Sequence, residues 1–187
     1  MTNENENPWQ ITSSQQIYDN PWINLTEHEV INPGGGKGIY GQVHFKNLAI
    51  GIIVLDEQDQ TWIVGQYRFP LNQYSWEIPA GGCPLGSDPA ETAIRELQEE
   101  TGILAANLME IQRMHLSNSV SDELAILYLA RELTFGHAEP EESEELQVKK
   151  MPFEEAYQMV LNGDITDSLS VAAILKLKVL KAQGMLL

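Results

Sequence analysis

Cysteine and basic side chains are scarce in this sequence. Cys83 is the only cysteine in 187 residues, so the chain forms no disulfide within itself, and we expect a reducing, cytoplasmic location. Lys and Arg number 11 against 27 Asp and Glu, which gives a net charge of −16 at pH 7. This charge repels phosphate backbones and anionic membranes, so neither nucleic acid nor a membrane is an expected partner. A small phosphorylated ligand is still compatible with it, provided that metal ions neutralise the binding site.

Long apolar runs are also missing, and no stretch approaches the length of a membrane span. The first residues are polar and acidic and lack the apolar core of a signal peptide, so residues 1–7 are expected to be a disordered tail. The rest of the chain, with an overall hydrophobic content of 43%, suits one compact domain with a small appendage.

The most informative stretch runs from Gly81 to Ile103. A glycine-rich loop leads into a short helix, for which Asp88 supplies an N-cap and Pro89 a first residue. Gly102 supplies a left-handed stop just past the last turn. The sequence therefore predicts a helix over residues 89–101.

Three glutamates of this helix share one face. Glu96, Glu99 and Glu100 stand at i, i+3 and i+4, where like charges weaken a helix unless a cation lies among them. Mg²⁺ and Mn²⁺ are hard ions that prefer such oxygen ligands. A solvated acidic face is the commoner meaning of a glutamate-rich helix. The glycine loop, Arg95 and the ending Thr101-Gly102-Ile103 favour a metal site here.

This stretch resembles the Nudix box: Gly, five residues, Glu, seven residues, Arg-Glu, apolar, any, Glu-Glu, any, Gly, apolar. The residues in register with it are Gly81, Arg95, Glu96, Leu97, Glu99, Glu100, Gly102 and Ile103. Ser87 stands where the pattern has its first Glu. In the family that Glu mainly supports the loop and the Arg, so its replacement bears on efficiency more than on identity. The resemblance implies a mixed sheet between helices, the α/β/α Nudix sandwich, over residues 48–187.

The resemblance also implies roles for residues outside the three glutamates, which it assigns to metal binding. It implies that the carbonyl of Ala80 binds metal, that Glu77 contacts the substrate and that Arg68 grips a diphosphate. A plain surface charge is the alternative for Arg68. Arg95 is expected to orient the carboxylates, and Glu100 counts with it among the catalytic residues.

An acidic run follows at residues 139–145. Read alone, it is a solvated loop. In the related pyrophosphatases a mobile acidic loop at this point carries a Glu that binds metal or activates water. That resemblance implies a catalytic role for Glu144, with Glu142 as the second choice.

The segment from residue 8 to 47 is rich in short β-type runs, and strands are expected over 22–25, 29–31 and 38–45. They would form a small antiparallel sheet that needs something to pack against. In the ADP-ribose pyrophosphatase branch a similar sheet forms much of a dimer contact, which implies a homodimer with Trp22 stacked on a nucleobase. Trp22 and Trp9 as plain core or interface aromatics are an equally good interpretation.

Further strands are expected over 49–55, 61–68, 109–116 and 124–130, with helices over 152–162 and after a cap at Thr166 or Asp167. Members that cleave ADP-ribose usually carry Ser-Pro-Gly between the third and fourth of these strands. Asn118 and Ser119 replace that Pro and Gly, so the substrate stays open between ADP-ribose and other nucleotide conjugates such as nucleotide sugars.

The resemblance predicts a Mg²⁺- or Mn²⁺-dependent enzyme that hydrolyses a nucleoside diphosphate linked to another moiety, X. The products would be a nucleoside monophosphate and X-phosphate. Two alternatives stay open: a nucleotide-binding sensor without turnover, and a housecleaning nucleoside triphosphate pyrophosphatase.

Overall fold

The computed structural model describes residues 6–138 and 146–185, and the chain divides into two compact units. The N-terminal unit comprises residues 1–47 and 115–123, and the core unit comprises residues 48–114 and 124–187. The expected tail falls mostly on residues 1–5, which lie outside the described residues. None of the helices within the described ranges could cross a bilayer.

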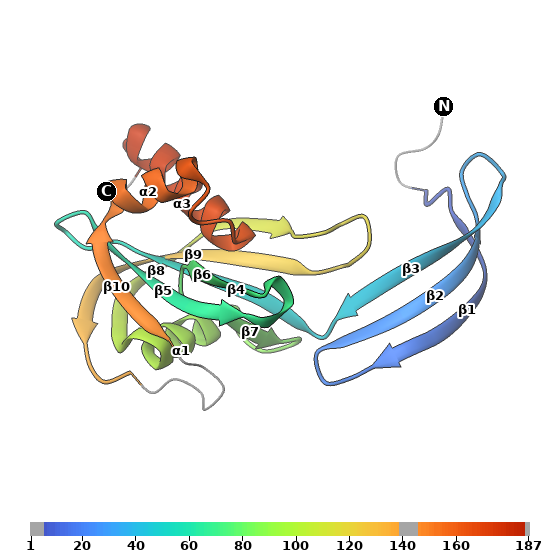
Figure 1. Cartoon of the computed structure of the whole chain (residues 1–187), viewed down its shortest axis with the longest axis horizontal. Coiled ribbons are helices and arrows are strands. Elements are labelled where there is room, and N and C mark those ends of the chain that lie inside the picture. The colour runs from blue at the N-terminus through green and yellow to red at the C-terminus, as the bar shows by residue number, and fades with distance from the viewer. Residues whose placement is uncertain (1–5, 139–145, 186–187) are drawn as a thin grey trace. The chain divides into compact units, whose positions relative to one another are not determined.

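Three antiparallel strands form the N-terminal unit's sheet, in the order β1-β2-β3 (Figure 1). Their bounds are Gln10–Asp19 for β1, Ile23–Ile31 for β2 and Lys37–Phe45 for β3. The two strands expected over 22–25 and 29–31 are one strand. The polar residues between them stay in the ladder because β2 has a paired neighbour on each side, so its backbone groups are satisfied whatever its side chains are.

The segment 115–123 is bound to β3, which the sequence did not indicate. The N–H of Val43 donates to the carbonyl of Val120 at 2.8 Å, and the N–H of Phe45 donates to Asp122 Oδ1 at 2.9 Å. His44 Nδ1 lies 2.5 Å from Asp122 Oδ2. Burial opposes ionisation of Asp122, but the hydrogen bonds from His44 and Phe45 outweigh it and hold the pKa of this carboxyl below its usual value.

The core unit contains two sheets, of four strands in the order β7-β4-β9-β8 and of three in the order β10-β5-β6. β4 and β9 run parallel, whereas β5 is antiparallel to both its neighbours, which confirms a mixed β arrangement. The strand bounds are Asn47–Val54 (β4), Gln60–Arg68 (β5), Gln73–Glu77 (β6), Ala80–Pro84 (β7), Ile103–His115 (β8), Leu124–Phe135 (β9) and Gln147–Pro152 (β10). A short 3₁₀ turn, Phe69–Leu71, joins β5 to β6.

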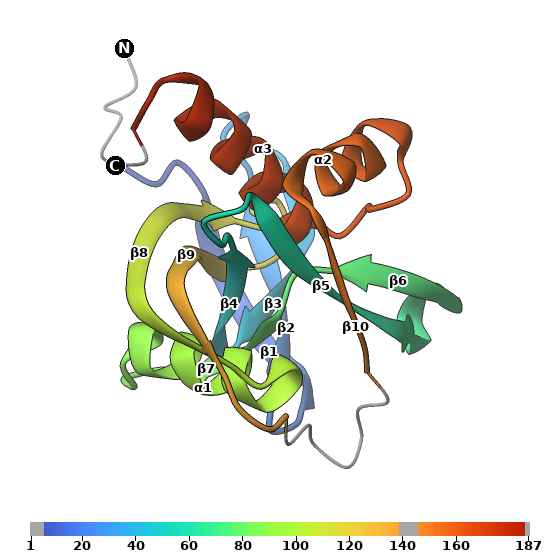
Figure 2. The same cartoon turned by 90° about the vertical axis from the view of Figure 1, so that its left-hand side faces the viewer.

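Helices cover the sheets of the core unit on two sides (Figure 2). α1 (Pro89–Thr101) lies on one side, and α2 (Phe153–Asn162) and α3 (Ser168–Ala182) lie on the other. Alternate residues of β4 serve the two sides: Ile52 packs in the cluster that contains Leu97 of α1, and Ile53 packs in the cluster that contains Ile174 of α3. The continuous apolar run of β4 is explained by this double coverage, and the α/β/α sandwich is confirmed.

Strand β7 was not expected, since its residues read as part of the glycine-rich loop. Ala80–Pro84 instead forms an edge strand beside β4, and the side chain of Cys83 is fully buried in the core on the α1 side. Cys83 is therefore a packing residue. On the other side of the core unit, the alternatives for the cap of α3 resolve to Asp167, whose side chain accepts from the N–H of Ser170.

Thr61 of β5 offers a test of the packing. It is buried, and its hydroxyl finds no hydrogen-bond partner within the described part of the chain. Thr61→Val should raise the free energy of unfolding by about 1 kcal/mol, because a desolvated orphan hydroxyl is replaced by a methyl group. Thr101→Val is the control, since the Thr101 hydroxyl donates to Leu97 O and accepts from Ile103 N–H. This variant should have a free energy of unfolding about 1 kcal/mol lower than that of the wild type. Equal losses in urea titrations of both variants would contradict the assignment.

Candidate active site

Helix α1 is fixed at both ends and along one face. Asp88 accepts backbone N–H bonds from the first turn, and Gly102 ends the helix with a left-handed φ of 70°, as predicted. Ala93 and Leu97 are fully buried against the sheet. Ile94 is 39% exposed, because it lies one residue beyond the stripe that faces the sheet.

Two of the three expected metal-binding carboxylates lie against the backbone of β7. Glu100 is only 2% exposed, and its Oε2 accepts a hydrogen bond from the N–H of Ala80 at 3.2 Å. A Cβ built on Gly81 would lie 2.1 Å from the carboxylate carbon of Glu96. Any side chain at position 81 would force that carboxylate to move, so the structure brings Glu96 and Glu100 to the backbone of two consecutive residues, Ala80 and Gly81.

Arg95 connects the outer carboxylates. Its Nη2 lies 2.5 Å from Glu96 Oε1, and its Nη1 lies 2.5 Å from Glu99 Oε2. Desolvation disfavours the charged guanidinium, but the charges of Glu96 and Glu99 outweigh that effect and raise the pKa of Arg95. The guanidinium thus supplies counter-charge to a glutamate face that would otherwise repel itself.

The donor set suits a hard divalent cation in kind. It consists of carboxylate oxygens from Glu96, Glu99 and Glu100 beside the peptide of Ala80, with no nitrogen or sulfur ligand. The missing Cβ at Gly81 gives one carboxylate its place beside the backbone. In the positions that the side chains of the described residues have here, no three His, Cys, Asp or Glu groups lie close enough together to hold an ion.

Arg68 and Glu77 are brought together as an ion pair in which the Arg68 side chain is 39% exposed. Arg68 Nε donates to Glu77 Oε1 at 2.9 Å and Nη2 donates to Oε2 at 2.5 Å, while Glu77 is 3% exposed. This hydrogen bonding raises the pKa of Arg68 against the effect of burial, with smaller contributions from the charges of Asp167 and Glu100. Arg68 therefore lies in the field of a predicted metal ligand, and Glu77 holds Arg68 in place.

The link between Glu77 and Ala80 is held by helix α3. The N–H of Ile78 donates to Ser170 Oγ at 2.8 Å, and Ser170 Oγ donates to Asp167 Oδ2 at 2.7 Å. The sequence indicated Asp167 as a cap but gave no sign of Ser170, whose partner is 92 residues away. The Asp-x-x-Ser spacing signals the capping bond alone.

The other predicted residues are placed as follows. Trp22 belongs to the N-terminal unit, follows the β1 strand in a turn closed by Asn20, and is 64% exposed. Ser87 is exposed, and its hydroxyl makes no hydrogen bond within the described ranges, so it does not replace the supporting contact of the pattern's Glu. Glu142 and Glu144 lie outside the described residues.

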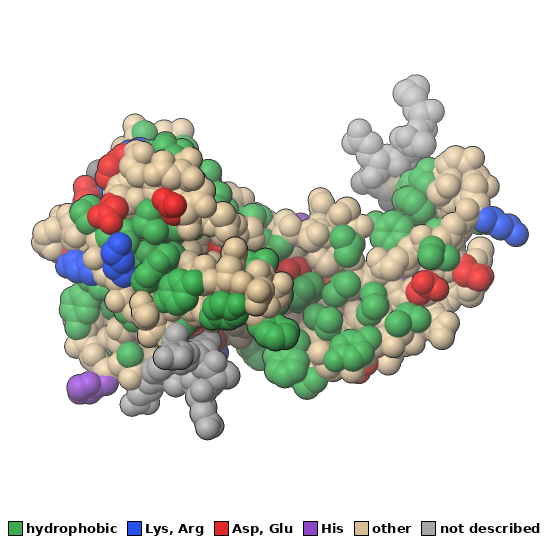
Figure 3. All heavy atoms as spheres, in the orientation of Figure 1, with side chains coloured by type: hydrophobic (Ala, Val, Ile, Leu, Met, Phe, Trp, Pro, Cys, Tyr) green, Lys and Arg blue, Asp and Glu red, His purple; other side chains and the backbone are tan. Residues whose placement is uncertain are grey.

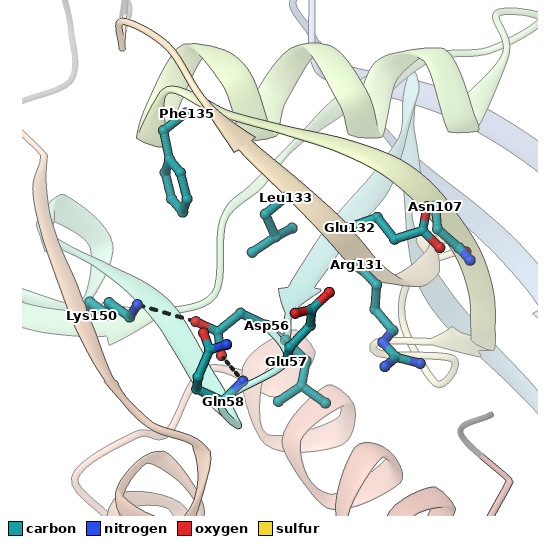
Figure 4. Close-up of a pocket in the computed structure, with 10 residues that line it drawn as sticks. Asp56, Glu57, Gln58, Asn107, Arg131, Glu132, Leu133, Phe135 and Lys150 are labelled. Atoms are coloured by element: carbon teal, nitrogen blue, oxygen red, sulfur yellow. Dashed lines mark hydrogen bonds and ion pairs between the residues drawn. The ribbon is translucent and has the colours of Figure 1, made fainter.

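A cavity of the core unit contains none of the predicted site residues. It measures about 430 Å³ and lies where the parallel strands β4 and β9 end, with Asp56, Arg131 and Phe135 in its lining (Figure 4). Asp56 accepts from the backbone of the β4–β5 turn, and Lys150 Nζ lies 3.1 Å from its Oδ2. These two side chains stabilise the turn, and the cavity shows no catalytic arrangement.

Comparison with known families matches nearly the whole chain. The profile of the NUDIX domain matches residues 45–170, and that of the nucleoside diphosphate sugar hydrolase N-terminal domain matches residues 9–43. A solved structure described as an ADP compounds hydrolase superposes with a TM-score of 0.85, over 97% of this chain and 99% of that one, at 19% identity. That likeness shows the fold.

Two curated relatives are similar over most of their length. The ADP-ribose pyrophosphatase of Bacillus subtilis is 30% identical over 172 residues, covering 91% of this chain and 92% of the relative. The ADP-ribose pyrophosphatase of Mycobacterium tuberculosis is 31% identical over 175 residues, covering 91% of this chain and 83% of the relative. With the NUDIX profile spanning more than half of the sequence, the chain belongs to the Nudix hydrolase family.

Proposed function

We propose that this protein hydrolyses a nucleoside diphosphate linked to another moiety, X, and releases a nucleoside monophosphate and X-phosphate. The observation that carries the proposal is the placement of Glu96 and Glu100 against the backbone of Ala80 and Gly81. Glu77, which forms an ion pair with Arg68, lies three residues before Ala80 in the chain. The carboxylates alone would repel a diphosphate. A metal cation held by them, together with the positive charge of Arg68, would neutralise it.

Glu96, Glu99, Glu100 and the Ala80 carbonyl are the groups that would hold Mg²⁺ or Mn²⁺. The bound ion supplies Lewis-acid chemistry, because it screens the anionic oxygens of the diphosphate and makes water more acidic. Arg95 keeps the outer carboxylates oriented through its two ion pairs. Arg68, fixed by Glu77, offers positive charge to the diphosphate, so Glu77 acts on the substrate through Arg68.

ADP-ribose and nucleotide sugars are the substrate classes to test first. Two relatives at 30% and 31% identity are named ADP-ribose pyrophosphatases, and residues 9–43 match a nucleoside diphosphate sugar hydrolase N-terminal domain. Asn118 and Ser119, in the loop bound to β3, differ from the Ser-Pro-Gly run usual in enzymes that cleave ADP-ribose. This difference favours keeping nucleotide sugars in the comparison.

Residues 8–47 we propose as a dimerisation subdomain, and residues 48–187 as the hydrolase domain of a cytoplasmic homodimer. The N-terminal sheet has three strands, and apolar side chains are exposed on its surface (Figure 3). Ile11, Ile17 and Ile39 are among the large ones. A sheet of this size is marginal unless its apolar side chains are covered. Trp22, exposed at a turn of the same sheet, is proposed to stack on the nucleobase.

The sensor alternative has one observation in its favour: Ser87 stands in place of the first Glu of the Nudix pattern and does not make that residue's supporting contact. The sensor predicts nucleotide binding without a product. The triphosphatase alternative predicts turnover of nucleoside triphosphates alone. Purified protein with Mg²⁺, offered ADP-ribose, nucleotide sugars and nucleoside triphosphates, separates the three. Thermal stabilisation by nucleotide with no phosphate product over hours would replace our proposal by the sensor.

Glu100→Gln tests the metal site. The amide oxygen can still accept from the N–H of Ala80, so the fold is kept, while the charge that binds the cation is lost. Turnover of the best substrate should fall by at least about 10- to 100-fold. Glu91→Gln, an exposed glutamate on the same helix, should leave it unchanged. Turnover that survives in Glu100→Gln would remove the metal assignment.

Glu144 is proposed, ahead of Glu142, as the group that takes a proton from the attacking water. Glu144→Gln should lower kcat by about 10²–10⁴-fold, with little change in KM, because a general base acts in the transition state. Glu142→Gln should stay within a few-fold of the wild type. A reversed order in steady-state kinetics would exchange the two assignments, and two fully active variants would exclude the loop as the source of the base.

The homodimer is tested by sedimentation equilibrium. The wild type should sediment with twice the 21.0 kDa mass of the chain at micromolar concentrations. Ile39→Glu, which places a charge among the exposed apolar side chains of the N-terminal sheet, should shift it toward the monomer. Lys37→Glu on the same strand is the charge control. A wild type that remains monomeric at these concentrations would refute the dimer.

A further inference from the structure

The two residues between β6 and β7 carry the chain from one sheet of the core unit to the other. Glu77, the last residue of β6, pairs with Val64 of β5, and Ala80 begins β7 in the other sheet. Ile78 and Pro79 form the link, so the residue that fixes Arg68 and the residue beside Glu100 flank it directly. Any shift of this link moves both of them.

The backbone of the link is satisfied from two directions. The Pro79 carbonyl accepts from the N–H of Ile52 in β4 at 2.8 Å. The N–H of Ile78 has left the ladder, and its hydrogen bond goes to the side chain of Ser170 at 2.8 Å. Ile78 and Ser170 are both buried, so without the serine hydroxyl this N–H would be left without water or a protein acceptor.

The Ser170 hydroxyl has a defined orientation. Asp167 Oδ2 accepts from Ser170 Oγ at 2.7 Å and from the N–H of Ser170 at 2.8 Å. Because the hydroxyl proton is committed to Asp167, the oxygen lone pairs are free to accept from Ile78. Asp167, Ser170 and Ile78 therefore form a chain of hydrogen bonds from the start of α3 to the link.

The same chain reaches the charged part of the site. The hydrogen bond with Glu77 raises the pKa of Arg68 against the effect of burial, and the charges of Asp167 and Glu100 raise it further by smaller amounts. The residue that orients Ser170 is thus close enough to act on the ion pair that precedes the link. The start of α3, the Arg68–Glu77 pair and the Glu100–Ala80 contact all meet at the same four residues, 77–80.

We propose that Ser170, oriented by Asp167, is a positioning residue that sets the Glu77–Ala80 link, and through it the backbone of Ala80, whose N–H donates to Glu100 and whose carbonyl is a proposed metal ligand. The proposal rests on the metal-dependent hydrolysis proposed above. Its test therefore includes readouts other than turnover, so that failure of one can be told from failure of the other.

The test compares Ser170→Ala with two controls on the same helix. Ser168→Ala removes an exposed serine hydroxyl two residues away, and Ile174→Val trims a buried side chain of the core cluster that also contains Ile78 while leaving the Ser170 hydroxyl in place. Amide hydrogen exchange is measured by NMR, and Mn²⁺ affinity by electron paramagnetic resonance. Steady-state kinetics on the best substrate give kcat and KM.

Ser170→Ala should speed exchange of the Ile78 and Ala80 amides by about 10-fold or more beyond either control, since one loses its acceptor and the other its fixed neighbour. Mn²⁺ binding should weaken by about 10-fold, in the range seen when a metal ligand loses its supporting partner. With Mn²⁺ saturating, kcat should fall by about 10- to 100-fold. Ile174→Val should lower the midpoint of unfolding without changing Mn²⁺ affinity.

Two variants of Asp167 separate orientation from charge. Asn at this position can accept from the Ser170 N–H or hydroxyl and cap the helix, whereas Ala cannot. Asp167→Asn should therefore bind Mn²⁺ within about 3-fold of the wild type, and Asp167→Ala should resemble Ser170→Ala.

The inference is overturned if Ser170→Ala matches Ile174→Val in amide exchange at Ile78 and in Mn²⁺ affinity, or if the wild type binds no Mn²⁺. A wild type that binds Mn²⁺ but turns over no nucleotide conjugate refutes the proposed function instead. In that case amide exchange and Mn²⁺ affinity still decide the role of Ser170.

Discussion

The site depends on the close fit of two glutamates of α1 to the backbone of β7 at Ala80 and Gly81. Three carboxylates on a turn and a half of helix repel one another, and Arg95 offsets this repulsion by pairing with two of them, Glu96 and Glu99. Gly81 admits the Glu96 carboxylate at a place that any side chain would fill, and the N–H of Ala80 binds Glu100. The helix is held for this contact by Ala93 and Leu97, which are buried in the sheet.

Each layer of the core unit contributes one part of this arrangement. α1 brings the carboxylates, and β7, an edge strand beside β4, brings the Ala80-Gly81 peptide. β5 and β6 bring Arg68 and Glu77 as an ion pair. α3 lies on the side of the sheets opposite α1, and its Ser170 binds the N–H of Ile78 in the link between β6 and β7. A helix that the sequence marks only as packing thus takes part in the geometry of the site.

Local signals explain what the sequence predicted well. Asp88 and Gly102 mark the ends of α1 by capping and backbone conformation, which depend on neighbours in sequence, and both bounds are confirmed. The apolar run of β4 reports its burial on both sides. The roles of the α1 glutamates, Arg95, Arg68 and Ala80 stay predictions, which the observed geometry supports. Glu77, expected to contact the substrate, is instead buried and paired with Arg68.

Contacts between distant residues explain what the sequence could not predict. The pairing of β7 with β4, the bond from Ile78 to Ser170 and the attachment of residues 115–123 to β3 all depend on tertiary structure. The polar residues of β2 are a strand only because both neighbours pair with it. Ile94 is an apolar residue, but helical geometry places it beyond the buried stripe of α1, so it is partly exposed.

The most direct test of the central claim is an anomalous-diffraction experiment on crystals soaked in Mn²⁺, recorded at the manganese absorption edge. The account predicts a peak among the carboxylates of Glu96, Glu99 and Glu100 and within bonding distance of the Ala80 carbonyl. An ordered helix α1 with no manganese at these side chains, at a concentration that supports turnover, would contradict it.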